Sequence, residues 1–116
     1  MNPIKIIFEL RDIAHYRHLY TESYAEHVAL NGFYDELLEL GDCFIESYQG
    51  VNGRITGPIM ISLPDPKDIN MQELLGSYKI SVIKLAESLE GEAGLINVLD
   101  DICTLIDKTQ YLLTLK

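Results

Sequence analysis

The chain has 116 residues, of which 47% are hydrophobic and 23% charged, and its formal net charge is −9. This length suits one domain with a single buried core. The acidic balance excludes a nucleic-acid partner, because phosphate recognition requires clustered Lys and Arg. No apolar run approaches the roughly 18 residues of a membrane span. Glu9 and Asp12 interrupt the N-terminal apolar patch too early for a signal peptide. We therefore expect a cytoplasmic protein without a membrane partner.

Apolar residues recur at helical spacing over residues 4–20, and Pro3 suits the first turn of such a helix. A polar break follows at 21–23, where Thr21 or Ser23 can cap a second helix. The alternative is one helix that continues through this point. Residues 23–48 again carry an apolar stripe of helical period. Gly32 and Gly41 lie inside it, each at a cost of about 1 kcal/mol relative to Ala, and Gly50 suits its end.

The segment 49–69 contains three Gly and three Pro and is predicted to be a long connection. No Gly-Lys-Ser/Thr follows its glycines, which argues against a phosphate loop. The run IMISL within it favours a short extended piece. A connection of this length can run the full height of a helical bundle. It would then make the helices on either side parallel, as in ferritin-type bundles.

Helical spacing returns over residues 70–89, where Asp68 or Asn70 can act as the cap, and over residues 93–115 after a turn at 90–92. The sequence thus predicts an all-α protein. Residues 1–116 are expected to form one four-helix bundle of the ferritin type, with a long crossover between helices two and three. Cys43 and Cys103 lie within helical patterns and are predicted to be reduced core residues.

The three histidines gather near the break between the first two predicted helices. His15 and His18 are one turn apart and share a face. If the chain reverses near Glu22, antiparallel helices bring His27 to the level of His15. Imidazole is a common ligand for iron, zinc and copper, so two or three facing rings form a candidate metal site.

Asp42 and Glu46 are four residues apart and so share one face of the second helix. Asp42 is fifteen residues from His27, which is about 22 Å along a straight helix. Metal–ligand bonds are near 2 Å, so one chain cannot close a site from both groups. Two chains can do so across a twofold axis. A shared metal therefore implies a homo-oligomer.

The order His15, His27, Asp42 and Glu46 resembles the ferroxidase pattern of mini-ferritins, the starvation-induced DNA-protecting proteins. In that family two His of one subunit meet an Asp and a Glu of its twofold mate. Residues 18–50 are also similar to small phage-encoded helical proteins of unassigned function. The resemblance implies a ferritin-like bundle, iron as the cofactor, and the host cytoplasm as the location if the protein is phage-encoded.

Several positions depart from the mini-ferritin pattern. Asn31 stands where that family usually has a carboxylate, the basic DNA-binding tail is missing, and His18 can replace His15 if the turn is tight. The leading hypothesis is iron binding, with ferroxidase activity, between subunits. His15, His18 and His27 would supply nitrogen ligands, and Asp42 and Glu46 oxygen ligands, with Tyr24 or Tyr34 as a supporting donor. The alternative is a non-catalytic helical oligomer that binds a protein partner or a small ligand. The sequence leaves open whether the protein is an enzyme.

Overall fold

A computed structural model describes residues 2–116. It contains four α-helices, α1 (Pro3–Tyr20), α2 (Tyr24–Asn52), α3 (Met71–Glu87) and α4 (Ala93–Leu112), and a short 3-10 helix, η1 (Pro66–Asp68). The all-α prediction is confirmed, and no strand occurs in the part of the chain that the structure describes. The run IMISL is accordingly not a strand, although it belongs to the non-helical segment between α2 and η1.

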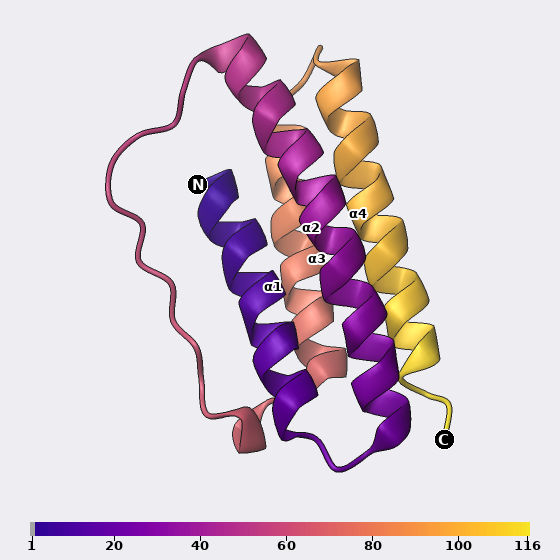
Figure 1. The fold of residues 1–116 in the computed structure, drawn as a ribbon. Coiled ribbons are helices and arrows are strands. Elements are labelled where there is room, and N and C mark those ends of the chain that lie inside the picture. The colour runs from indigo at the N-terminus through magenta and orange to yellow at the C-terminus, as the bar shows by residue number, and fades with distance from the viewer. Residues whose placement is uncertain (1) are drawn as a thin grey trace.

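The helices form a bundle in which α1 and α4 each pack against both α2 and α3. As Figure 1 shows, α1 and α2 form an antiparallel hairpin, and so do α3 and α4. The crossover returns the chain to the opposite end of the bundle before α3 begins, so α2 and α3 run in the same direction (Figure 1). The predicted long crossover between helices two and three is therefore confirmed.

Side-chain caps set the helix starts. Asn2 accepts from the N–H of Ile4, Ser23 from the N–H of Glu26, and Asn70 from the N–H of Glu73. Such caps satisfy N–H groups that have no partner inside the helix. The break predicted at 21–23 is confirmed. The predicted end of α2 at Gly50 is wrong, because the helix continues to Asn52 and ends where Gly53 adopts a φ of 85°.

The core combines aliphatic residues from all four helices with two aromatic rings of α2. Its fully buried large side chains include Leu10, Leu30, Phe33, Leu37, Phe44, Leu75, Leu99, Ile102 and Ile106. Both cysteines are free thiols, as predicted. Cys43 is exposed rather than in the core, because it falls on the outer face of α2 next to buried Phe44. Cys103 is partly buried and packs against the core.

The crossover is fastened to one side of α1 at three points. Lys5 Nζ donates to the carbonyl of Met60 (2.6 Å), the N–H of Ser62 donates to Glu9 (3.1 Å), and Arg17 donates to the carbonyl of Pro66 (2.6 Å). The contacts follow the same order along both segments, so the crossover runs parallel to α1. Arg17 also pairs with Glu26 (3.0 Å), which joins α1, α2 and η1 at one end of the bundle.

Glu9 of α1 connects this crossover to α3. The phenol of Tyr78 on α3 donates to the Glu9 carboxylate, which also accepts from Lys5. Burial by itself would raise the pKa of Glu9. The hydrogen bonds from Tyr78, Ser62 and Lys5 outweigh that effect and lower the pKa of this carboxyl. Burial, together with the bond to Glu9, raises the pKa of the Tyr78 phenol. The phenol therefore stays protonated and donates at neutral pH.

Candidate functional site

The predicted gathering of the histidines at the α1–α2 hairpin occurs, with His18 rather than His15 opposite His27. The His18 and His27 rings stack with their centroids 3.7 Å apart and their planes 16° apart. The tight turn between α1 and α2 causes this register. His15 lies 6.0 Å from His18, centroid to centroid, and stacks on Tyr34 at 4.3 Å.

The stacked rings are fixed by two reciprocal hydrogen bonds. His18 Nδ1 lies 2.7 Å from the carbonyl oxygen of His27, and His27 Nδ1 lies 2.9 Å from that of His18. A carbonyl oxygen only accepts, so both Nδ1 atoms carry the proton and donate. The His18 carbonyl is in the last turn of α1, where carbonyls have no helical partner, so the His27 ring satisfies it. The pair therefore links the end of α1 to the start of α2, and we call His18 and His27 with these two hydrogen bonds the histidine clasp.

The clasp also determines what these two histidines can ligate. With Nδ1 protonated, each neutral ring keeps its lone pair on Nε2, the arrangement common in metal-bound histidines. The lone pair lies in the ring plane. The two ring planes are only 16° from parallel and the ring centroids are 3.7 Å apart, so the planes meet only well beyond the metal–nitrogen distance of about 2 Å. His18 and His27 in these positions do not bind the same ion.

The other predicted ligands lie apart from the clasp. Asp42 and Glu46 are exposed on the outer surface of α2, towards the opposite end of that helix. Within residues 2–116, no three His, Cys, Asp or Glu side chains are placed to hold one metal ion. Of the predicted supporting donors, Tyr34 donates to Asn31 (2.7 Å) and Tyr24 is 81% exposed. One chain thus brings the histidines together but not the acidic pair, as the sequence indicated.

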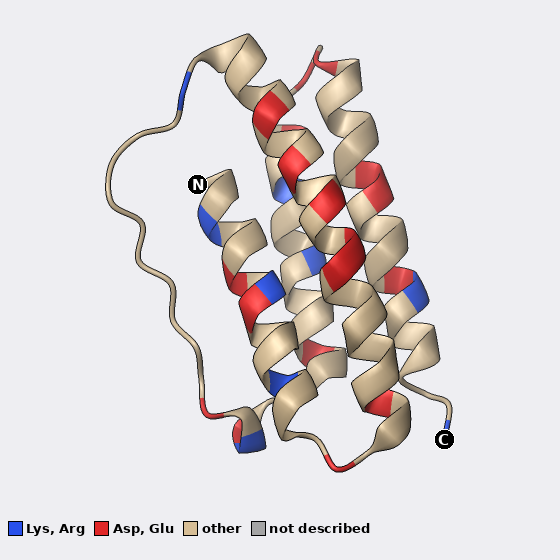
Figure 2. Cartoon of the chain, in the orientation of Figure 1, with Lys and Arg blue, Asp and Glu red and all other residues tan. Residues whose placement is uncertain are grey.

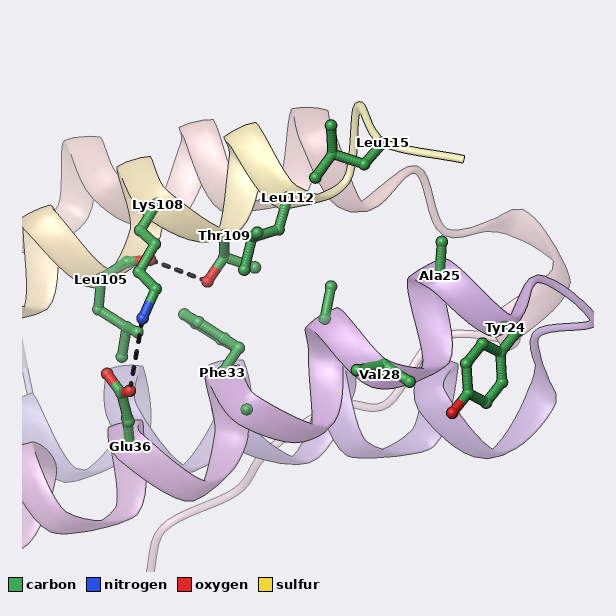
Figure 3. Close-up of a pocket in the computed structure, with 12 residues that line it drawn as sticks. Tyr24, Ala25, Val28, Phe33, Glu36, Leu105, Lys108, Thr109, Leu112 and Leu115 are labelled. Carbon is green, nitrogen blue, oxygen red and sulfur yellow. Dashed lines mark hydrogen bonds and ion pairs between the residues drawn. The ribbon is translucent and has the colours of Figure 1, made fainter.

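A groove lies between the start of α2 and the end of α4 (Figure 3). Its volume is about 340 Å³. We call it the apolar groove, and its lining comprises Tyr24, Ala25, Val28, Ala29, Gly32, Phe33 and Glu36 of α2 with Leu105, Lys108, Thr109, Leu112 and Leu115 at the end of the chain. Glu36 and Lys108 pair at 3.8 Å across one end of it, and Leu112 and Leu115 stand at the other (Figure 3).

The groove exists because α2 presents small residues to α4 at this point. Ala25, Ala29 and Gly32 recur at helical spacing and leave room beside the larger Phe33. The one hydroxyl on the floor, that of Thr109, donates to the Leu105 carbonyl in its own helix (2.8 Å). The proton of this hydroxyl is therefore already used within α4. Sequence reasoning missed this site, although the spacing of the three small residues was the signal that pointed to it.

These observations define the class: a small all-α bundle with a long crossover, a histidine clasp and an apolar surface groove. A family of unknown function, DUF5856, matches residues 18–113. The chain belongs to that family. It is also 34% identical over 107 residues, 88% of this chain and 77% of the relative, to the "uncharacterized 14.6 kDa protein in mobD-ri intergenic region" of Enterobacteria phage T4.

No solved structure matches the chain significantly. The predicted similarity to small phage-encoded proteins of unassigned function is confirmed by the T4 relative, whereas the matching family is not a ferritin family. None of the helices among residues 2–116 has the length and apolar character that crossing a membrane requires.

Proposed function

We propose that the protein is a non-catalytic binding module that holds an apolar segment of a protein partner in the groove between α2 and α4. The observation that carries this proposal is the groove itself. Its floor is apolar, and Val28 and Tyr24 at its rim are 49% and 81% exposed. Apolar side chains on a partner would remove this surface from water, at about 25 cal/mol per Å² of apolar area buried. An amphipathic helix is the usual occupant of such a groove.

A 20-residue helical peptide with Leu on one face and Gln elsewhere tests this proposal. We expect it to bind the protein, as measured by fluorescence anisotropy of a labelled peptide. Replacing Gly32 by Leu places a side chain in the groove, where an added Cβ meets no atom within 4 Å. We expect this variant to bind the peptide at least about tenfold more weakly, because the space that accommodates one Leu is then filled.

Gly50→Leu is the matched control. Gly50 is an exposed residue of α2 outside the groove, and an added Cβ there also meets no atom within 4 Å. Both variants therefore make the same Gly-to-Leu change within α2, but only Gly32→Leu places the new side chain in the groove. Equal affinity of both variants and the wild-type protein for the peptide would refute the proposed binding site.

A second candidate function is iron binding and oxidation at a ferritin-like intersubunit site. Two observations favour it. The clasp leaves Nε2 of His27 as the ring's lone-pair position, and Asp42 and Glu46 are exposed on α2. The ferritin-like site would form between two copies, with His27, or with His15 and its exposed ring, opposite the acidic pair of the other chain. Iron bound there would supply the oxidation chemistry.

Aerobic incubation with ferrous iron tests this second candidate. We expect ferric absorbance to appear with the wild-type protein and to fall to the protein-free rate in the double variant Asp42→Asn, Glu46→Gln. Both side chains are exposed, so the variant keeps the fold. A control with Glu87→Gln and Glu90→Gln changes the charge equally at the α3–α4 hairpin, outside the proposed site. Identical iron oxidation in the wild-type protein and both variants would eliminate this site.

A further inference from the structure

Beyond the groove, the exposed side of α2 carries a row of carboxylates towards the C-terminal end of the helix. Tyr24 and Val28 at the groove rim are followed along the same side of the helix by Asp35, Glu39, Asp42 and Glu46, which we call the acidic stripe. At 100° per residue, these six positions lie within about 60° of arc. This side of α2 is thus apolar over the first turns of the helix and acidic over the later turns.

The acidic stripe is not neutralised by the chain's own basic residues. α2 contains no Lys or Arg, and Figure 2 shows acidic positions along its length without a basic one. The ion pairs of α2 among residues 2–116 involve Glu26 with Arg17 and Glu36 with Lys108, both outside the stripe. Asp35 accepts a hydrogen bond from Asn31 (3.3 Å), which leaves its charge in place.

From the groove rim at Val28 to the end of the stripe at Glu46, the line is about 27 Å long at 1.5 Å per residue. An α-helix of about 20 residues covers that length. Such a helix would place apolar side chains in the groove and basic side chains against the four carboxylates. The volume of the groove, about 340 Å³, accommodates one or two large apolar side chains rather than a whole helix face.

Resting on the function proposed above, we infer that the occupant of the apolar groove is a basic amphipathic helix of another protein. Its apolar residues enter the groove, and its Lys and Arg residues lie along the acidic stripe. Charge complementarity selects this occupant over a second copy of the chain. A twofold pairing through α2 would bring two acidic stripes together, with a net charge of −9 on each copy, and like charges oppose such contact.

The inference is tested with three peptides that share one Leu face and carry Gln, Lys or Glu at the flanking positions. We expect the Lys peptide to bind the wild-type protein about tenfold more tightly than the Gln peptide, since several exposed ion pairs each contribute a modest amount. We expect the Glu peptide to bind more weakly than the Gln peptide. Raising the salt concentration from 0.05 to 0.5 M should largely remove these differences through screening.

A variant in which the two Asp of the stripe become Asn and the two Glu become Gln removes its charge and leaves the groove unchanged. It therefore tests the basic partner separately from the proposed binding in the groove. This variant should bind the Lys and Gln peptides equally. A control with the same charge change outside the stripe, at Glu73 of α3 and at Glu87, Glu90 and Glu92 of the α3–α4 hairpin, should keep the wild-type preference. All eight side chains are exposed, and circular dichroism checks that each variant is folded.

Each outcome has a definite meaning. A preference for Lys that disappears only in the stripe variant supports the inference. Equal binding of the three peptides to the wild-type protein, with loss of binding in Gly32→Leu, overturns the basic partner and leaves the groove function intact. No binding of any of the three peptides overturns both.

Discussion

Replacing His18 by Ala is expected to lower the free energy of unfolding by about 2–3 kcal/mol, because the clasp is lost. The ring is 7% exposed and stacks on His27 at 3.7 Å. Stacked rings of this kind contribute about 0.5–1.5 kcal/mol, a hydrogen bond about 1 kcal/mol, and the buried carbon atoms the remainder. In a domain of this size the melting temperature should fall by about 8–12 °C.

Urea unfolding followed by circular dichroism at pH 7 measures this change. His27→Ala and the double variant complete a mutant cycle, in which we expect a coupling of about 1 kcal/mol between the two rings. His15→Ala is the control, since that ring is exposed and should change the stability by about 0.5 kcal/mol at most. Additive losses at His18 and His27 would show that the stack contributes nothing.

Gly41→Ala is expected to destabilise the protein by about 1–3 kcal/mol, although Ala favours a helix more than Gly. A Cβ at Gly41 would lie 2.6 Å from Cγ2 of Ile7 on α1. This methyl is attached directly to the branched Cβ of Ile7, so it moves only with a change of rotamer or a shift of the helix. Overpacking of this kind costs more than the gain in helix propensity of about 1 kcal/mol.

Gly32→Ala is the matched control because it lies in the same helix with no atom within 4 Å of the added Cβ. We expect it to stabilise the protein by about 0.5–1 kcal/mol. Opposite signs for the two variants in thermal unfolding would confirm that α1 and α2 approach closely at Gly41. Equal stabilisation by both would contradict that packing.

The order and type of the elements were predictable because they depend on local signals. Ser23 and Asn70, each one of two predicted caps, cap their helices, and the Gly- and Pro-rich crossover could not continue a helix. The end of α2 was less predictable. Gly50 and Gly53 are equally plausible stops in a sequence, and only the backbone at Gly53, with its positive φ, distinguishes them.

The site depended on tertiary register, which local signals do not give. The sequence placed three imidazoles at one hairpin, but a shift of one helical turn decided that His18 rather than His15 stacks on His27. The apolar groove depended on which helix lies beside α2. Ala25, Ala29 and Gly32 form a surface hollow only because α4 is their neighbour and ends with Leu112 and Leu115 nearby.

Because neighbouring helices in the bundle are antiparallel, their dipoles change the electrostatic free energy of the acidic stripe. The later turns of α2 approach the negative end of its own macrodipole, where carboxylates are disfavoured. The same turns lie beside the starts of α1 and α4, whose N-terminal ends each carry about half a positive elementary charge. These two helix starts partly offset the repulsion among the four carboxylates. The bundle can thus retain an unneutralised anionic surface without a lysine or arginine in α2.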